Sequence, residues 1–302
     1  MKLLLLGKNG QVGWELQRSL APLGEVVACD FDSPGDLRAD FSQPESLAAL
    51  VQRVQPDVIV NAAAHTAVDK AESEPALAEA LNASAPGVLA REAAARGAWL
   101  LHFSTDYVFD GSGDQPRNED APPAPLSVYG RTKWEGEQAI RASGCRHLIL
   151  RTSWVYAARG GNFARTMLRL AAERDELRVI DDQIGAPTGA DLLADVSAHA
   201  LRAVQQSPQL AGTYHCVAAG HTSWHGYARF VIEWARAHGQ TVKVAPDAIR
   251  PTPTSSYPTP ARRPLNSRLD TSRLQSAFGL TLPAWQPGVE RMLREVLTTV
   301  ST

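Results

Sequence analysis

Apolar residues form a continuous run over residues 3–6, and a cluster of glycines follows this run directly. Beyond the glycines, Trp14, Leu16, Leu20 and Leu23 recur at the spacing of one helix face. The same order of strand and helix then repeats. The pattern predicts strands over residues 3–6, 25–29, 57–60, 98–103 and 147–152, and helices after the glycines and over residues 44–54, 86–96 and 129–143. Short loops between such units predict an α/β fold, a doubly wound parallel sheet of the Rossmann type.

The alternation loosens after residue 155. Here the sequence predicts a helix near residues 163–174, strands near Arg178 and Tyr214, and a helix over residues 223–238. These elements indicate a smaller, partly interleaved C-terminal substrate lobe. We therefore expect a dinucleotide-binding domain over residues 1–155 and a mainly substrate-binding lobe over residues 156–302, with some segments returning to the first domain.

The positions of prolines predict two helix starts and one extended segment. Pro44 and Pro86 stand at the predicted starts of two helices, where a missing N–H is tolerated. Residues 250–264 contain five prolines, which predicts an extended surface segment. A linker is one interpretation of this segment, but a folded stretch is expected over residues 265–300, so a loop that contacts substrate is the other.

Composition excludes several classes of partner. The chain has 302 residues, of which 44% are hydrophobic, so it can bury a substantial core. Its formal net charge of −2 argues against nucleic acid and against an anionic membrane surface. The three cysteines, Cys29, Cys145 and Cys216, are widely spaced, which fits neither a disulfide framework nor a metal site. The first residues are too short an apolar run for a signal peptide, so we expect a cytoplasmic protein.

The glycine cluster after the first predicted strand is a candidate phosphate-binding turn. Gly7 permits the tight turn, Gly10 lets the backbone approach a pyrophosphate, and Gly13 allows close packing of helix on strand. The helix N-terminus supplies free N–H donors to the phosphates. A plain strand-to-helix turn is the alternative, but the position at the head of a βαβ unit favours a dinucleotide.

Asp30 follows the second predicted strand, where a carboxylate can accept hydrogen bonds from the adenosine ribose and would repel a 2′-phosphate. This favours NADH over NADPH. A polar turn with Asp32 and Ser33 is the alternative, and the nearby Arg38 leaves NADPH open.

The strongest chemical signal lies in the segment 104–111, at the end of a predicted buried strand, together with Tyr129 and Lys133. The latter two are four residues apart on a predicted helix and share one face. An ammonium group there would lower the tyrosine pKa towards working pH, which suits a general acid for a developing alkoxide, and Thr105 can donate to the same oxygen. An ordinary exposed tyrosine and lysine are the alternative.

These motifs together resemble the extended short-chain dehydrogenases, and within them the dTDP-4-dehydrorhamnose reductase family. The similarity runs through segments 7–13, 61–72, 104–111, 129–133, 151–156, 183–189 and 263–269. It implies a catalytic set of Thr105, Tyr129 and Lys133. It also implies substrate contacts from Thr105, Asp106 and Trp154. The implied cofactor contacts, added to the glycine turn and to Tyr129 and Lys133, are Gln11, Val12, Asp30, Asp40, Phe41, Ala64, His65, Thr66 and Phe103.

The resemblance implies a reaction: reduction by NADH or NADPH of the C4 keto group of dTDP-4-dehydro-L-rhamnose, the last step of dTDP-rhamnose biosynthesis for cell-surface polysaccharide such as the lipopolysaccharide O-antigen. Tyr107 stands where related 4,6-dehydratases carry a glutamate, which disfavours dehydration. The segment from Thr105 to Tyr107 also departs from the strand end of the 4-epimerases. A non-catalytic regulatory subunit, like that of methionine adenosyltransferase, is the alternative, because fold alone does not separate the two.

Several other residues are candidates for single roles. His65 and Trp154 each have a structural interpretation, and the resemblance assigns them to cofactor and substrate. We expect Arg263 to hold the substrate diphosphate, since a planar guanidinium suits phosphate oxygens. The histidines lack the spacing of a zinc site. Some relatives bind Mg²⁺ near a homodimer contact. The counterparts of those Mg²⁺ ligands are Glu15, Asp191 and Glu295, although Asp191 is shorter than the expected glutamate.

Overall fold

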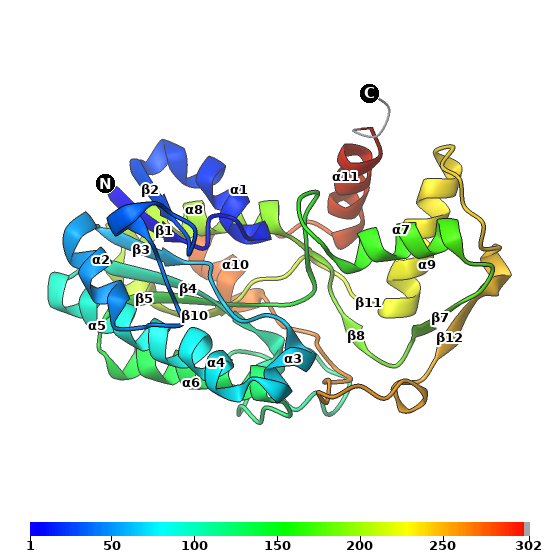
Figure 1. Cartoon of the computed structure of the whole chain (residues 1–302), viewed down its shortest axis with the longest axis horizontal. Helices are drawn as coiled ribbons and strands as arrows, with labels where there is room; N and C mark the ends of the chain where they lie inside the picture. The colour runs from blue at the N-terminus through cyan, green and yellow to red at the C-terminus, as the bar shows by residue number, and fades with distance from the viewer. Residues whose placement is uncertain (299–302) are drawn as a thin grey trace.

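The computed structural model describes residues 1–298 of the chain (Figure 1). A six-stranded sheet forms the larger lobe, with strand order β10-β5-β4-β3-β1-β2 and every pair parallel. Its strands are β1 (Lys2–Leu6), β2 (Glu25–Cys29), β3 (Val58–Asn61), β4 (Trp99–Thr105), β5 (Arg146–Thr152) and β10 (Gly212–His215). The predicted doubly wound parallel sheet is confirmed.

Helices cover both faces of this sheet because its strands are apolar on both sides. In β1, Leu3 and Leu5 pack into one core while Leu4 and Leu6 pack into the other. The first face carries α1 (Gln11–Leu20), α8 (Ala190–Gln206) and α10 (Ser272–Phe278). The second face carries α2 (Ser46–Val54), α5 (Ala85–Arg96) and α6 (Val128–Ala142).

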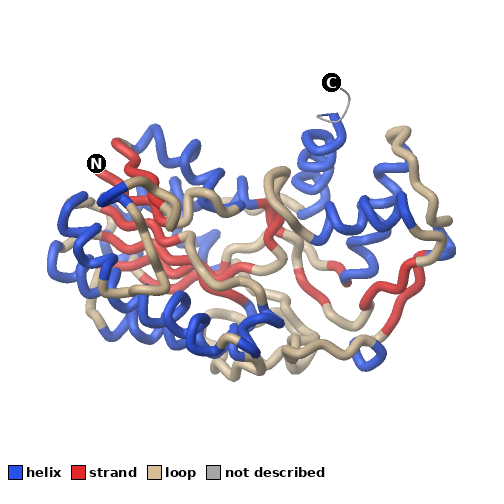
Figure 2. Tube along the Cα trace, viewed as in Figure 1, coloured by secondary structure: helices blue, strands red, loops and turns tan. Residues whose placement is uncertain are grey.

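The smaller lobe has a core of its own between three helices, α7 (Phe163–Glu173), α9 (Trp224–Ala237) and α11 (Trp285–Thr298). Three short strand pairs border it (Figure 2). They are β7 (Leu177–Ile180) with β12 (Ile249–Thr252), β8 (Ile184–Gly185) with β11 (Thr222–Ser223), and β6 (Val155–Tyr156) with β9 (Thr188–Gly189). Residues 299 and 300, the end of the predicted folded stretch, lie outside the described residues.

The chain passes between the two lobes more than once. Strand β10 adds to the large sheet beside β5, and α8 packs on α1, although both follow residue 155. Helix α10 then returns to pack on β10 and α8. Single-turn 3₁₀ helices connect the main elements at Ala21–Leu23, Gly35–Leu37, Asp106–Val108, Pro208–Leu210, Pro246–Ala248 and Thr254–Ser256.

One of the two proline-based helix starts is wrong, and the other is confirmed. Pro44 precedes α2, which begins at Ser46 after a turn. Pro86 lies in the first turn of α5, as predicted. Helix α5 continues a segment that starts at α4 (Pro75–Glu79), which follows α3 (Val68–Ser73). A π-helical turn at Ala80–Ser84 joins α4 to α5. Its wider i→i−5 bonding, in which the Ala85 N–H donates to the Ala80 carbonyl, admits a proline within the first turn of α5.

The proline-rich segment is extended, as predicted, and it is fastened to both lobes. Its first residues belong to β12, which pairs with β7. Further along, the Thr254 N–H donates to both carboxylate oxygens of Asp182 at 2.9 Å, and the Ala261 N–H donates to Asp69 at 3.2 Å. These contacts argue against a free linker. Within the described residues, no helix is both long and apolar enough to cross a bilayer.

Candidate active site

A cavity of about 860 Å³ opens at the carboxyl ends of the large sheet and reaches the smaller lobe. This edge is where ligands bind in open α/β sheets. Of the site residues predicted from sequence, the lining contains Gly7, Gly10, Gln11, Val12, Asp30, Asp40, Phe41, Ala64, Thr66, Phe103, Thr105, Asp106, Tyr129, Lys133 and Trp154. Gly13, His65 and Arg263 do not line it.

The glycine turn has no room for side chains, because the backbone after β3 and the turn's own backbone lie too close. Gly7 has φ +87°, and a Cβ there would lie 2.7 Å from the Ala63 nitrogen. A Cβ on Gly13 would lie 1.9 Å from the Gly7 carbonyl oxygen, so Gly13 serves packing and not contact with the cavity. Gly10 caps α1 without a side-chain hydrogen bond, and no acidic residue stands in the first turn. The free N–H groups of that turn therefore suit an anionic pyrophosphate.

The end of the cavity next to β2 combines a carboxylate with an exposed aromatic ring. Asp30 accepts from the Asn9 N–H at 3.0 Å and from the Phe31 N–H at 2.8 Å. Phe31 lines the cavity and is 64% exposed, which suits stacking against a base. Arg38 pairs with Asp40 at 3.4 Å. Sequence reasoning missed Phe31, because a single aromatic residue after a strand has no periodic signal.

His65 is buried behind the cavity wall. Its backbone N–H donates to the Asn82 side-chain oxygen at 2.9 Å, and the Asn82 amide donates back to its carbonyl at 3.1 Å. The ring Nε2 lies 3.5 Å from a Glu74 carboxylate oxygen. These bonds make His65 a support for the backbone that carries Ala64 and Thr66 into the cavity.

Tyr129 enters the cavity from the first turn of α6, which Ser127 caps by accepting from the Gly130 N–H at 3.2 Å. Its ring packs edge-on against Tyr107, with 5.5 Å between centroids. Burial raises the pKa of Tyr129 to about 12, and a hydrogen bond from Thr105 opposes this shift. The expected lowering of the tyrosine pKa is therefore wrong for this arrangement, because desolvation of the phenolate is the largest effect. Tyr129 stays protonated at neutral pH.

Lys133 lies one turn further along α6 and is almost fully buried. Its Nζ donates to the Phe103 carbonyl at 2.6 Å and lies 3.1 Å from Nε2 of His102. Burial lowers the pKa of Lys133 to about 8, and the Glu137 carboxylate opposes this shift.

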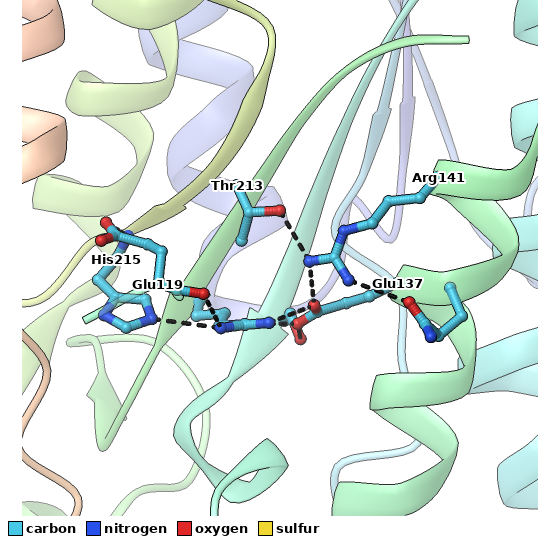
Figure 3. Close-up of polar contacts among 8 residues, drawn as sticks. Glu119, Glu137, Arg141, Thr213 and His215 are labelled. Atoms are coloured by element: carbon cyan, nitrogen blue, oxygen red, sulfur yellow. Dashed lines mark hydrogen bonds and ion pairs between the residues drawn. The ribbon is translucent and has the colours of Figure 1, made fainter. Parts of the chain in front are cut away.

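Glu137 belongs to a buried ion cluster beneath the carboxyl end of β4. It accepts from Ser104 Oγ at 2.6 Å and from two guanidinium nitrogens of Arg151 at 2.8 and 2.7 Å. Figure 3 shows Arg141 reaching from α6 to both Glu137 and Thr213 of β10, at 2.8 and 2.9 Å. Breaking a fully buried pair leaves an unpaired charge, at a cost of about 3–5 kcal/mol. The cluster thus fixes α6 against β4, β5 and β10.

Asp106 and Thr152 present buried polar atoms to the cavity. Oδ2 of Asp106 and Oγ1 of Thr152 have no hydrogen-bond partner. The other Asp106 oxygen accepts from the Thr105 hydroxyl at 3.0 Å. Burial raises the pKa of Asp106 to about 6. Unpaired buried polar atoms are costly, so these two indicate a polar ligand in this part of the cavity.

Trp154 forms the wall that faces the smaller lobe. Its backbone has φ +48°, a strained conformation for a tryptophan, and its ring stacks on Trp224 with 3.6 Å between centroids. Trp224 donates to the Gln183 side-chain oxygen at 3.1 Å. A Cβ at Gly185 would lie 2.6 Å from the Trp154 ring, so a glycine is required behind it. Sequence reasoning missed Trp224, whose helical position resembles an ordinary core residue.

Arg263 lies beside the cavity and is paired. It donates to Asp69 at 2.7 Å and to the Ala261 carbonyl at 3.3 Å. A hydrogen bond also links it to Tyr107, which lines the cavity. Arg263 therefore fastens the proline-rich segment to the wall of the cavity.

The carboxylates of the predicted Mg²⁺ site do come within electrostatic range of one another, and burial raises the pKa of Glu15. Arg291 lies between the other two, 3.5 Å from Asp191 and 3.3 Å from Glu295, while Arg18 pairs with Glu15. Among residues 1–298, no cluster of three or more ligating side chains could hold a metal ion. This arrangement does not fit Mg²⁺.

Comparisons with known proteins all point to one family. A family model described as the RmlD substrate binding domain matches residues 1–298. The chain is 58% identical over 301 residues to a dTDP-4-dehydrorhamnose reductase of Shigella flexneri, with 100% of both chains covered. A crystal structure of a dTDP-4-dehydrorhamnose reductase from Clostridium acetobutylicum has a TM-score of 0.85 and 36% identity, and covers 100% of both chains. A Bacillus anthracis dTDP-4-dehydrorhamnose reductase in complex with NADP has a TM-score of 0.84 and 33% identity, and covers 97% of this chain and 99% of its own.

Proposed function

The chain belongs to the dTDP-4-dehydrorhamnose reductase family, and from that membership we propose that its cavity reduces the C4 keto group of dTDP-4-dehydro-L-rhamnose with Thr105, Tyr129 and Lys133 as the catalytic set. Its activity is that of an NAD(P)H-dependent oxidoreductase at the last step of dTDP-rhamnose biosynthesis. Its similarity to reductases over its full length favours an enzyme over a non-catalytic regulatory subunit.

One observation carries the assignment of residues. Tyr129 and Lys133 lie one helical turn apart on α6, both line the cavity, and Thr105 hydrogen-bonds to Tyr129. The glycine turn, Phe31 and Asp30 fit a dinucleotide at the other end of the same cavity. When bound, a reduced nicotinamide supplies a hydride to the carbonyl carbon of the substrate.

Tyr129 donates its phenolic proton to the carbonyl oxygen as negative charge develops there. The raised pKa keeps that proton in place until the oxygen becomes basic enough to take it. Thr105 stabilises the resulting phenolate by turning its single hydroxyl proton from Asp106 to the phenolate oxygen, and the Lys133 ammonium stabilises it through its charge.

We assign the sugar to the polar atoms of Asp106 and Thr152 and to the ring of Trp154, and the nucleotide to the smaller lobe. Residues 1–155 then hold the dinucleotide, with β10, α8 and α10 completing their sheet. For the cofactor, Asp30 supports NADH, while the NADP complex of the Bacillus anthracis relative supports use of NADPH by this fold.

The test is turnover by the purified chain with dTDP-4-dehydro-L-rhamnose, followed by NADH and NADPH oxidation. Tyr129→Phe should lower kcat by about two orders of magnitude, the size of a lost general acid, with little change in cofactor affinity. Tyr257→Phe is the matched control, because Tyr257 is 61% exposed and does not line the cavity. A Tyr129→Phe variant with wild-type kcat would refute the assignment.

A further inference from the structure

Behind Lys133, a chain of buried polar groups runs away from the cavity through two strands of the large sheet. His102 on β4 lies 3.1 Å from Lys133 Nζ, and Asn61 on β3 lies 3.0 Å from the far nitrogen of the same imidazole. Asn61, His102 and Lys133 are only 1%, 0% and 2% exposed. The roles described so far for the site do not use Asn61 or His102.

The hydrogen bonds of this chain depend on each other. The Ala63 N–H donates to Asn61 Oδ1 at 3.1 Å, so the Asn61 amide nitrogen faces His102 Nδ1 at 3.0 Å. That nitrogen donates, so Nδ1 must accept. A neutral imidazole carries a single N–H, which then lies on Nε2 and points at Lys133.

An ammonium group cannot accept this N–H, because all of its hydrogen-bonding positions are donors. A neutral amine can accept it with its lone pair while it donates to the Phe103 carbonyl, 2.6 Å away. All groups are therefore paired when Lys133 is neutral. A charged Lys133 requires the imidazole proton on Nδ1, which meets an acceptor only if the Asn61 amide turns over and gives up its bond to Ala63.

We propose that Asn61 and His102 are positioning residues that couple the charge of Lys133 to the tautomer of His102, so that the catalytic lysine changes between amine and ammonium as the imidazole proton changes nitrogen. The inference rests on the proposed function of Lys133. Each proton that Lys133 gains or loses moves the imidazole proton from one ring nitrogen to the other, and His102 itself stays neutral.

The charges around Lys133 agree with this coupling. Glu137, one turn further along α6, favours the ammonium, while Tyr129, one turn before, stays neutral. Burial and the neighbouring lysine hold the pKa of His102 well below its usual range, so the imidazole has no charged form to supply. Burial lowers the pKa of Lys133 to about 8, so its ammonium is present below that pH and is lost as the pH rises through it.

The coupling predicts that kcat/KM falls at high pH as Lys133 loses its ammonium proton. It also predicts that substitution of Asn61 moves the pH of this alkaline limb. In Asn61→Asp, one carboxylate oxygen keeps the Ala63 N–H and the other accepts from Nδ1, which fixes the imidazole proton on Nδ1 and leaves Nε2 free to accept from an ammonium. The limb should move to higher pH by about one unit or more, equivalent to a tenfold gain in the proton affinity of Lys133. An unmoved limb in a folded Asn61→Asp variant would overturn the proposal.

A second measurement separates tautomer exchange from the added charge of the aspartate, and it needs only the wild-type chain. Protein labelled with ¹⁵N in its histidine rings is titrated by NMR from pH 6 to 10, with His102 identified by its loss in His102→Asn. We expect the N–H of His102 to lie on Nδ1 at pH values below the alkaline limb of kcat/KM and on Nε2 at pH values above it. A tautomer that stays the same across the limb would refute the coupling.

Failure of this inference can be told apart from failure of the proposed function. Lys133→Met should lower kcat strongly if Lys133 is catalytic, whatever His102 does. Wild-type turnover by Lys133→Met would refute the catalytic assignment itself. An inactive Lys133→Met variant together with a fixed His102 tautomer would refute the coupling alone.

Discussion

Replacing Asp106 with asparagine is expected to stabilise the protein above pH 6 while it impairs catalysis. Asp106 is buried at the cavity, and one of its oxygens, Oδ2, has no hydrogen-bond partner. The other oxygen accepts from the Thr105 hydroxyl. The asparagine variant can keep that accepting oxygen and place its amide nitrogen at the unpartnered position. The Ser267 hydroxyl, whose hydrogen bond to the carboxyl group lowers its pKa, can bond to the amide instead, so shape is preserved and the charge is lost.

The magnitude follows from the pKa of Asp106, which burial raises from 3.8 to about 6. A shift of about two units corresponds to about 3 kcal/mol of unfavourable free energy for the ionised form in the folded state. Because the folded-state pKa is raised, the folded protein binds more protons than the unfolded chain between pH 3.8 and 6. Stability of the wild type therefore falls as pH rises through this window, and the loss is complete above pH 6.

The assay is thermal unfolding of wild type and Asp106→Asn at pH 4, 5, 6, 7 and 8. An unfolding entropy of about 0.6 kcal/mol/K for a chain of this length converts about 3 kcal/mol into an increase in Tm of about 5 °C at pH 7. The difference should shrink towards zero at pH 4. Asp110→Asn is the matched control, because hydrogen bonds from Ser112 lower the pKa of Asp110, so its loss should not stabilise the protein.

The same variant should lose activity. A charged hydrogen bond to a sugar hydroxyl contributes about 1.5–3 kcal/mol, so kcat/KM should fall by about tenfold to a hundredfold. Equal or lower Tm for Asp106→Asn at pH 8, or a Tm difference that does not depend on pH, would refute the electrostatic reasoning.

Two further predictions concern the ends of the cavity. Asp30→Ala should weaken NADH binding and shift the NADH/NADPH ratio of kcat/KM towards NADPH, because the carboxylate that repels a 2′-phosphate is gone; Asp32→Ala is the control, and an unchanged ratio for Asp30→Ala would contradict the role. Arg263→Ala should raise KM for the sugar nucleotide about tenfold and leave kcat nearly unchanged, whether Arg263 contacts the diphosphate directly or holds the loop through Asp69. The exposed Arg262→Ala is its control, and kinetics that did not distinguish the two arginine variants would count against any role of Arg263 in substrate binding.

The elements of the large sheet could be predicted from sequence because their signal is local. Residues 3–6 form an unbroken apolar run, and the structure packs their side chains alternately into two cores. Pro44 misled the prediction by two residues because a missing N–H is tolerated in the turn before a helix as well as in its first turn, whereas Pro86 does lie in the first turn of α5. The pairing of β10 with β5 depends on a long-range contact that no local pattern encodes.

The residues of the candidate site also fall into two groups, those with a local sequence signal and those placed only by long-range packing. The glycine turn and the Tyr129–Lys133 pair have fixed spacings within one turn or helix, so they were recognisable from sequence. Trp224 reaches Trp154 from a helix 70 residues further along the chain, and its position follows only from the packing of the two lobes. His102 lies within an apolar strand and carries no spacing signal relative to Lys133.

Helix α6 explains why hydrophobic periodicity alone would misassign the catalytic face. Tyr129, Lys133 and Glu137 recur every four residues, and such a polar stripe normally predicts the solvent-exposed side of a helix. The structure turns this stripe inward, because Glu137 pairs with the buried Arg151 and Lys133 bonds to a strand carbonyl. Burial of these charges costs least where each of them has a partner. It follows that the charged groups that fix α6 also create the desolvated surroundings that shift the pKa values of Tyr129 and Lys133, so that the residues proposed as catalytic and their supporting ion cluster form one structural unit.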